Sequence, residues 1–310
     1  MCFDLNLRQR SIYRRVGHKY TAAGHNICIN SIGNMKIVGH MEPDIAINPS
    51  PIKPSVIANR HIRIVRIIRF DRNDIITAAI INSIGDIHGR ADLLEQLHEK
   101  IQTDAETYTG KKTIVYLGDY IDRGEHSRQV IETLLSNPLK DFNAIHLQGN
   151  HEKAMLDFIE YPGAAAAWLT FGGRETLNSY GIPLAYIPSM REVGGLAKQL
   201  DEKLPDEHRT FMNNCLDSWQ CGSYFFVHAG IRPGVALDKQ KIEDKLWIRE
   251  DFLGSTTNHG TIVVHGHSTN LQPELLPNRI GIDTAAFNTG VLTCLVLEGE
   301  EQRLLQTGVA

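Results

Sequence analysis

The chain is short of cysteine, and the few cysteines that it has are not arranged for cross-linking. They are Cys2, Cys28, Cys215, Cys221 and Cys294. Their number is odd and no pair has CxxC spacing, which argues against a disulfide framework. We therefore expect reduced thiols and a cytoplasmic location.

Long apolar runs are also absent. No stretch approaches the roughly 20 apolar residues of a membrane span, and the N-terminus lacks the charged-then-apolar order of a signal peptide. Hydrophobic residues make up 42% and charged residues 22% of the 310 residues, which is ordinary for a globular protein. This length suits one large α/β domain or two smaller ones.

Charge is unevenly distributed along the chain, which indicates a boundary near residue 78. Residues 1–80 contain 12 Lys/Arg and 5 Asp/Glu, whereas the rest contains 20 Lys/Arg and 31 Asp/Glu. Prolines interrupt residues 1–78, and 62–68 is the stretch there that could form a strand. This basic segment is either an arm for nucleic acid or acidic membranes, or a disordered extension outside the domain. We favour the second interpretation, so no stable nucleic-acid partner is expected, and His40 is read as incidental.

Three short segments place Asp, Asn or His between glycines, directly after apolar runs. They are GDIHG at 85–89, GDYIDRG at 118–124 and GNHE at 149–152. Asp86 precedes Asp119 by 33 residues, and Asp119 precedes Asn150 by 31. This interval is about one strand–helix–strand unit, so the segments are expected at the same edge of one sheet.

Apolar periodicity predicts the elements around these segments. Strands are expected at 78–84, 113–117 and 142–147, each followed by an amphipathic helix, which indicates a largely parallel sheet. Ligands bind beyond the carboxyl ends of such strands. Residues 160–220 are expected to form a small helical cap, with helices at 164–169, 193–200 and 211–219. Short strands then predict a second, mixed or antiparallel sheet packed on the first; they lie at 223–230, 261–267, 278–284, 290–298 and 302–308.

The strand ends carry six side chains with oxygen or imidazole donors. They are Asp86, His88, Asp119, Asn150, His228 and His267. One zinc ion would take only three or four of these, whereas six suit two divalent ions, for which we expect manganese, with iron or zinc as alternatives. Asp119 is central in the series and is the expected bridge. Two ions that share a water would lower its pKa and supply hydroxide for phosphoester hydrolysis. His265 is read as structural or as a support of the site.

A proton donor for the leaving group is expected beside these ligands. His151 follows Asn150 directly, and an imidazolium there needs a carboxylate to orient it. Asp122 is the candidate carboxylate. Arg123 next to it is suited to grip phosphate oxygens in a bidentate fork.

The segments GDIHG, GDYIDRG, GNHE, VHAG (227–230) and GHS (266–268), in this order, resemble the phosphoprotein phosphatase family of calcineurin-like metallophosphoesterases. The bacterial serine/threonine phosphatases similar to the phage lambda enzyme look most alike, over about residues 79–300. The resemblance implies an α/β fold of two packed mixed sheets flanked by helices, a four-layer sandwich, with a binuclear metal centre at the strand ends.

The resemblance also implies roles for individual residues. The implied metal ligands are, for one ion, Asp86, His88 and Asp119 and, for the other, Asp119, Asn150, His228 and His267. His151 would be the general acid, paired with Asp122. Arg123 and Asn150 would contact phosphate, and WIRE (247–250) points to Arg249 as a further phosphate arginine.

Three features depart from the family pattern. Ser268 stands where Thr is usual, and Ala285 replaces a Gly in IDTAA (282–286), which limits the backbone there. The basic segment before residue 79 has no counterpart. The catalytic domain is therefore expected to span 79–310.

The leading functional hypothesis is a metal-dependent phosphomonoester hydrolase that acts on phosphoserine or phosphothreonine, in a phosphorylated protein or a small phosphoester. The alternative is a symmetrical bis(5'-nucleosyl)-tetraphosphatase. Those enzymes resemble this chain but tend to lack the Asp of the DRG element and to read GNHD, whereas this chain has Asp122 and Glu152. A non-catalytic scaffold would be marked by loss of a metal ligand or of His151, and none is missing.

Overall fold

The computed structural model describes residues 20–22, 25–29, 35–37, 76–186 and 188–308. The chain divides into two compact units, Met1–Ala58 and Asn59–Ala310. In the first unit, three short strands pair antiparallel in the order β1-β2-β3, which the sequence analysis did not anticipate. They are β1 Tyr20–Ala22, β2 His25–Ile29 and β3 Met35–Ile37. The possible strand at 62–68 and His40 lie outside the described residues, and the boundary near residue 78 stays a prediction.

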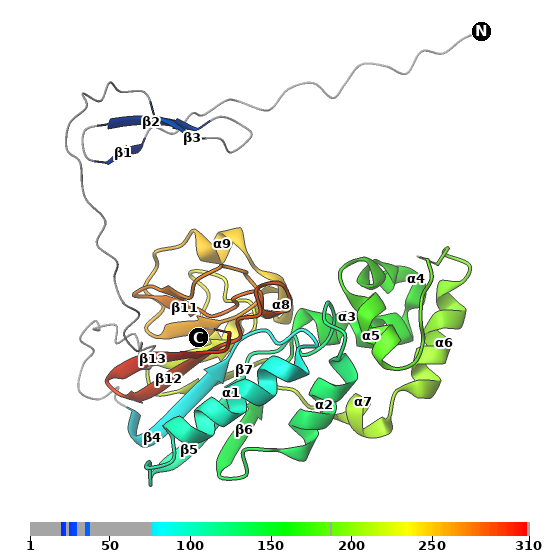
Figure 1. Ribbon diagram of the computed structural model, residues 1–310, viewed down its shortest axis with the longest axis horizontal. Helices are drawn as coiled ribbons and strands as arrows, with labels where there is room; N and C mark the ends of the chain where they lie inside the picture. The colour runs from blue at the N-terminus through cyan, green and yellow to red at the C-terminus, as the bar shows by residue number, and fades with distance from the viewer. Residues whose placement is uncertain (1–19, 23–24, 30–34, 38–75, 187, 309–310) are drawn as a thin grey trace, which may run out of the picture. The chain divides into compact units, whose positions relative to one another are not determined.

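The second unit contains two five-stranded sheets (Figure 1). The first has the order β13-β12-β4-β5-β6. Its strands are β4 Ile76–Ile84, β5 Lys111–Tyr116, β6 Phe142–His146, β12 Thr293–Gly299 and β13 Glu301–Gln306. The three strands that precede the glycine-flanked segments are parallel, as predicted.

The prediction for the last two strands was wrong. We expected 290–298 and 302–308 in the second sheet, but β12 pairs antiparallel with β4, and β13 with β12. The reason lies in the apolar run of β12. Cys294 and Val296 face one hydrophobic core, and Leu295 and Leu297 face another. A strand that is apolar on both sides is stable only in the middle of a covered sheet.

The second sheet has the order β10-β11-β9-β8-β7. Its strands are β7 Ser218–Cys221, β8 Tyr224–Val227, β9 Ile262–His265, β10 Glu274–Leu275 and β11 Arg279–Gly281. The three central strands are parallel and the two edge strands antiparallel, so the sheet is mixed. The predicted strands at 223–230, 261–267 and 278–284 are found here in shorter form.

A dry apolar layer holds the two sheets together. Ile81, Val115 and Leu295 of the first sheet share one cluster with Phe226 and Val264 of the second. Each is almost fully buried, and burial of such a side chain stabilises the fold by roughly 1.5–3 kcal/mol. This layer fixes the two sheets face to face and brings their strand ends to one side.

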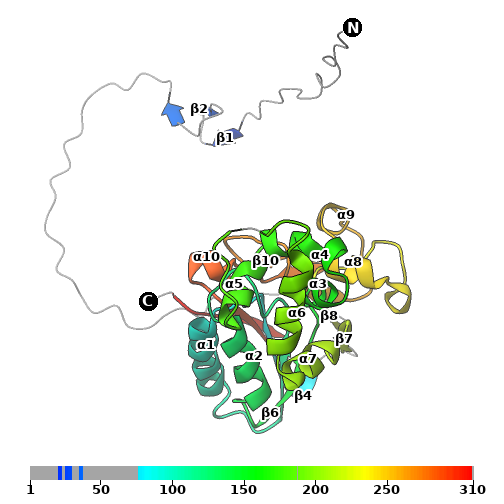
Figure 2. The same ribbon diagram turned by 90° about the vertical axis from the view of Figure 1, so that its right-hand side faces the viewer.

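Helices cover the outer face of each sheet, which gives the predicted four layers (Figures 1 and 2). Those against the first sheet are α1 Ala91–Asp104, α2 Ser127–Ser136 and α3 Asn150–Glu160. Those of the second sheet and its connections are the 3-10 helix η2 Leu237–Lys239, α8 Ile242–Trp247, α9 Glu250–Leu253 and α10 Ala286–Thr289. Figure 1 shows α1 and α2 across the first sheet, on the opposite side from α8 and α9.

The segment between α3 and β7 is helical. It contains α4 Pro162–Ala165, the 3-10 helix η1 Ala166–Thr170, α5 Gly173–Ser179, α6 Val193–Lys203 and α7 Asp206–Asn213. The predicted helix at 211–219 was wrong, because α7 ends at Asn213 and residues 218–221 form β7. Trp219 pairs with Phe226 across the strands instead, and their rings pack 5.3 Å apart. An aromatic cross-strand pair of this kind stabilises a sheet and outweighs helical periodicity.

Among the residues that the structure describes, no helix has both the length and the apolar character needed to cross a membrane.

Candidate metal centre

The side chains that the sequence singled out come from the carboxyl ends of strands in both sheets. Asp86 and Asp119 follow β4 and β5, and Asn150 opens α3 after β6. His228 follows β8 directly, and His267 stands two residues after β9. All are buried. Charged and polar groups avoid such burial unless they are paired or bind a cation.

Asp119 is the centre of this cluster. Its Oδ2 lies 3.5 Å from His88 Nε2 and 3.8 Å from His151 Nε2, and its Oδ1 lies 3.4 Å from His228 Nε2. Two groups have donor atoms close enough to hold a metal ion, and Asp119 belongs to both. They are His88, Asp119 and His151, and Asp119, His228 and His267. Although burial alone would raise the pKa of Asp119, the imidazoles around it, foremost His228, hold that pKa below its usual value.

The tautomers of two histidines leave lone pairs aimed into the cluster. His88 Nδ1 donates to the carbonyl of Ile121 at 2.8 Å, and His228 Nδ1 donates to that of Leu117 at 2.9 Å. A carbonyl can only accept, so the Nε2 atom of each neutral ring is an acceptor. His88 Nε2 is buried without a hydrogen-bond partner and faces a carboxylate oxygen. A backbone carbonyl that accepts the other ring N–H orients a metal-binding imidazole in this way.

Asn150 presents a further acceptor to the same space. Its Oδ1 lies 2.8 Å from His228 Nε2 and 2.8 Å from His267 Nδ1. His228 Nε2 carries a lone pair, so it and Asn150 Oδ1 are two acceptors at hydrogen-bond distance. Their contact is repulsive unless both bind the same cation. Burial lowers the pKa of His88 to about 3, and burial together with the neighbouring His228 imidazole lowers that of His267 to about 2. Both rings are thus neutral at physiological pH, the form that ligates metals.

Asp86 belongs to neither of the two groups, although it is close to both. Its carboxylate oxygens accept the backbone N–H of His267 at 3.0 and 3.1 Å. Burial and the nearby charges of Asp283 and Asp119 raise the pKa of Asp86. Asp283, which the sequence analysis missed, is itself buried. Three carboxylates crowded in a buried site are stabilised when a divalent cation supplies the opposing charge.

His151 makes a close pair with Asp122. Its Nδ1 lies 2.6 Å from Asp122 Oδ2, and both side chains are buried. Burial alone would lower the pKa of His151, but the charge of Asp119 and the hydrogen bond to Asp122 raise it above the usual value. Nε2 lies 3.2 Å from Nη2 of Arg123, whose guanidinium stacks 4.8 Å from the Phe287 ring. The three residues predicted to assist phosphate chemistry therefore adjoin one another.

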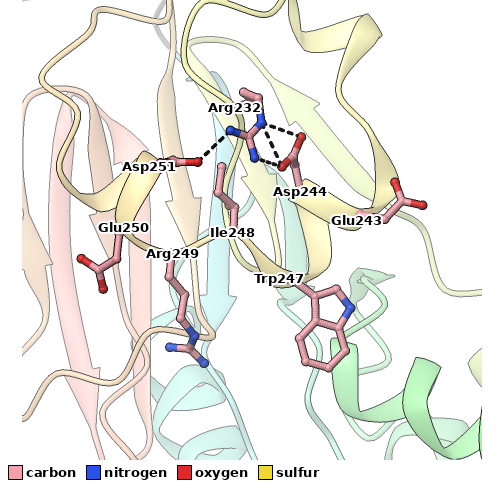
Figure 3. Close-up of a pocket in the computed structure, with 8 residues that line it drawn as sticks. All are labelled: Arg232, Glu243, Asp244, Trp247, Ile248, Arg249, Glu250 and Asp251. Atoms are coloured by element: carbon pink, nitrogen blue, oxygen red, sulfur yellow. Dashed lines mark hydrogen bonds and ion pairs between the residues drawn. The ribbon is translucent and has the colours of Figure 1, made fainter. Parts of the chain in front are cut away.

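Arg249 lies apart from this inner cluster. It is exposed and lines a surface pocket together with Trp247 and Glu250. Figure 3 shows Arg249 and Trp247 pointing to the same side, away from the ion pairs that Arg232 makes with α8 and α9. The Arg249 guanidinium contributes to the lowered pKa of His267. Its charge thus influences the cluster, but the Arg249 side chain makes no hydrogen bond or ion pair within the described part of the chain.

Glu152 is a residue whose structural role the sequence analysis missed. Its buried carboxylate accepts four backbone N–H groups, from Gly149 at 3.0 Å, Asp119 at 2.9 Å, Tyr120 at 2.8 Å and Ile121 at 3.2 Å. It therefore ties the loop after β5 to the start of α3. The signal was present in GNHE, since a Glu three residues after the N-cap residue, here Gly149, commonly caps a helix.

Backbone strain gathers at the same place. Seven non-glycine residues in the described part of the chain have positive φ: His88, Asp119, Asp122, Arg123, Asn137, His267 and Ala285. All except Asn137 belong to the cluster or its immediate surroundings. Each such conformation costs on the order of 1–3 kcal/mol and persists only where the surrounding structure imposes it. Their concentration marks this edge of the sheets as a functional site.

Comparison with known proteins agrees with this geometry. The sequence model of the calcineurin-like phosphoesterases matches residues 81–289. The chain belongs to that family. It is 25% identical over 241 residues to a protein of Anoxybacillus flavithermus named bis(5'-nucleosyl)-tetraphosphatase PrpE [asymmetrical], covering 70% of this chain and 89% of the relative. The protein of the same name from Halalkalibacterium halodurans is 25% identical over 237 residues, covering 68% and 87%.

A solved structure supports the same fold. It is described as a putative diadenosine tetraphosphatase, and it superimposes with a TM-score of 0.53 at 19% identity, over 74% of this chain and 95% of that one. As a calcineurin-like phosphoesterase, the chain is a hydrolase of phosphoester bonds, and enzymes of this family use divalent metal ions. The buried lone pairs around Asp119 fit such ions.

Proposed function

We propose that this phosphoesterase hydrolyses phosphomonoesters whose leaving group is an alkoxide, as in phosphoserine and phosphothreonine. The observation that carries the proposal is the buried His151–Asp122 pair, 2.6 Å apart, next to the Asp119 cluster. An alkoxide is a poor leaving group and needs a proton as the ester bond breaks, which a general acid supplies. A site that cleaved only good leaving groups would gain little from this pair.

We assign the metal ligands as Asp86, His88, Asp119, Asn150, His228 and His267, with two ions, manganese being the expected metal. Asp119 faces both groups of donors, so it is assigned as the bridge. Divalent ions bound there would supply an activated water and positive charge against the phosphate oxygens. Asp86 belongs to neither group, but it is held at the cluster because its oxygens accept the His267 amide.

The protein's own groups do the rest in this proposal. His151 holds its Nδ1 proton toward Asp122 and presents Nε2 toward Asp119 and Arg123, where the leaving oxygen would take up a proton. Arg123, held against Phe287, grips a phosphate oxygen. Arg249, exposed in a surface pocket outside the inner cluster, is assigned as a second phosphate contact.

A second candidate substrate is a dinucleoside tetraphosphate. The curated relatives named above carry that activity in its asymmetrical form, and the match spans most of their length. Their name favours cleavage into unequal nucleotides rather than the symmetrical reaction considered from the sequence. In both the symmetrical and the asymmetrical reaction the leaving group is a nucleotide phosphate. Such a group departs without protonation more readily than an alkoxide.

The test is an assay of the purified chain with Mn²⁺ on three substrates: a phosphoserine peptide, an activated aryl phosphate and diadenosine tetraphosphate. The proposal expects turnover of the peptide, and a fall of roughly 10²–10⁴-fold in kcat on the peptide in His151→Ala. The loss on the aryl phosphate should be much smaller, because that leaving group needs little protonation. The metal content of the variant should match that of the wild type.

Two outcomes would overturn the proposal. One is an equal loss on the peptide and the aryl phosphate in His151→Ala, which would remove the acid role. The other is a wild-type preference for diadenosine tetraphosphate by more than roughly 100-fold in kcat/KM, a ratio that binding to polar groups can supply, which would give the second candidate precedence.

A further inference from the structure

The carboxylate of Asp122 is held by two side chains of the helical segment 162–213. The indole Nε1–H of Trp168, in η1, donates to Asp122 Oδ2 at 2.7 Å. The hydroxyl of Thr176, in α5, donates to Asp122 Oδ1 at 2.6 Å. With His151 on Oδ2 at 2.6 Å, both oxygens are occupied, so the carboxylate is fixed in rotation.

The backbone of Asp122 is held from the same side. Its N–H lies 2.9 Å from Thr176 Oγ1 and 3.0 Å from Ser127 Oγ. The amide of Arg123 donates to the carbonyl of Gly172 at 3.2 Å. Gly172 has φ 126°, and a Cβ there would lie 2.7 Å from the Arg123 nitrogen, so this close approach needs glycine. The helical segment thus makes hydrogen bonds to the backbone of both Asp122 and Arg123.

The helical segment also contacts His151 itself. Phe171, between Trp168 and Thr176 in the chain, packs edge-on against the His151 ring with centroids 5.3 Å apart. One stretch of nine residues, 168–176, therefore contacts the carboxylate, the adjoining arginine and the imidazole. The sequence analysis expected a small helical cap at 160–220 and named no site residue in it.

We propose that Trp168 and Thr176 are positioning residues for the leaving-group acid: they hold Asp122 so that it orients the His151 imidazole. The inference rests on the acid role proposed above for His151. A carboxylate whose two oxygens both accept hydrogen bonds is held in one direction, and so is the group that it orients. The Trp168 and Thr176 donors come from outside the sheets. The helical segment therefore supplies hydrogen bonds that position the Asp122–His151 pair, in addition to covering it.

Trp168 also has a packing role, and the experiment has to separate the two. Its ring is 1% exposed, packs 5.1 Å from Phe158 and leaves no room for a Cβ at Gly173. Trp168→Phe keeps an aromatic ring but removes the N–H. Thr176→Val removes the hydroxyl at nearly constant volume, whereas Thr176→Ser retains it. Trp219→Phe is the matched control, because Trp219 packs in β7 against Phe226, at the rim of the apolar layer between the sheets.

The expected result is a loss that depends on the leaving group. Removal of one hydrogen bond to a charged group should lower kcat on a phosphoserine peptide by roughly 10- to 100-fold in Trp168→Phe and Thr176→Val. The loss on an activated aryl phosphate should be less than about threefold, and KM and metal content should not change, since an acid serves the leaving group only. Thr176→Ser should recover most of the lost activity, and Trp219→Phe should act as wild type.

A double-mutant cycle completes the test. If Trp168 acts through His151, Trp168→Phe should have almost no further effect on the peptide in a His151→Ala background, because coupled residues are not additive. Equal losses on both substrates, or additive losses in the cycle, would overturn the inference and leave Trp168 a packing residue. If instead His151→Ala itself loses both substrates equally, it is the acid role in the proposed function that fails.

Discussion

Ala285 donates its backbone N–H to Asp283 Oδ1 at 2.9 Å, and it does so from the left-handed region, at φ 52° and ψ 49°. A side chain with a Cβ is strained there, and the family pattern has glycine at this position. The hydrogen bond anchors the buried Asp283 carboxylate. Burial raises the pKa of Asp86, and the nearby Asp283 and Asp119 raise it further. The left-handed backbone of Ala285 is therefore linked to the position of the Asp283 carboxylate.

Ala285→Gly should therefore stabilise the protein. Glycine relieves the left-handed strain of about 1–2 kcal/mol, partly offset by its greater freedom in the unfolded chain, about 0.4–1 kcal/mol. We expect the free energy of unfolding to rise by about 0.5–1 kcal/mol, measured by urea denaturation. Ala286→Gly is the control: Ala286 opens α10 with ordinary helical geometry, so that variant should be destabilised. A loss of stability in Ala285→Gly would show that the alanine is not strained.

Asp119→Asn should lower the occupancy of both metal ions, because one carboxylate faces both groups of donors. An amide keeps the shape but removes the charge that opposes the cations. Activity should fall by roughly 100-fold or more, since the metal ions supply several kcal/mol of transition-state stabilisation. The control is Asp157→Asn, which removes a half-exposed partner of Lys153 on α3. Metal analysis that finds two full equivalents in an active Asp119→Asn variant would contradict the bridging assignment.

Glu152→Gln should destabilise the metal centre without removing a ligand. The amide nitrogen of Gln would face backbone N–H groups that now donate to Glu152. A buried N–H that loses its acceptor costs about 1–3 kcal/mol. We expect a lower free energy of unfolding and weaker metal binding, by titration calorimetry. Unchanged metal affinity with reduced stability would restrict Glu152 to a folding role.

Stability should fall as pH decreases from about 7 to 5, in part through His98. Burial lowers the pKa of His98 from its usual 6.5 to about 4, and its Nε2 accepts the hydroxyl of Tyr116 at 2.9 Å. Between these two pKa values the unfolded chain binds a proton that the folded chain does not, so stability is present above pH 6.5 and is lost as pH falls. The slope is at most about 1.4 kcal/mol per pH unit for one histidine.

His98→Gln should make this pH dependence less steep in urea unfolding at pH 7.5, 6 and 5. The metal site titrates too, but it is common to both proteins, so the difference in slope isolates His98. Parallel curves for wild type and variant would show that His98 is protonated equally in the folded and unfolded chains.

Deletion of residues 1–75 should leave a folded enzyme that binds metal. β4 begins at Ile76, and its pairing with both neighbours runs along Ile80–Ile84. Extending the deletion through Ile84 should abolish folding, since a central strand is lost. Circular dichroism melting and metal content would report both. Failure of the shorter deletion to fold would place part of residues 1–75 within the catalytic domain.

The sequence predicted the elements that carry local signals. Short apolar runs ending at glycine marked β4, β5 and β6, and 3.6-residue periodicity marked α1 and α2. Strand membership was a different matter. Nothing local to 290–306 says which sheet it joins, because the pairing of β12 with β4 joins residues some 210 positions apart in the sequence. The helix expected at 211–219 failed for the same reason, since Trp219 pairs with Phe226 only once the sheet exists.

The site shows the same difference between what local sequence predicts and what tertiary structure decides. Residue type and order alone indicated metal-dependent phosphoester chemistry, because Asp, Asn and His beside glycine at strand ends have few other uses together. Tertiary structure decided the angles and the partners: the left-handed backbone of His88, Asp119 and His267, the four amides on Glu152, and the donors from Trp168 and Thr176 to Asp122. These depend on contacts between residues some 30 to 50 positions apart. Such contacts form only when the packed sheets and the helical segment bring distant backbone groups within hydrogen-bond distance, which no local pattern encodes.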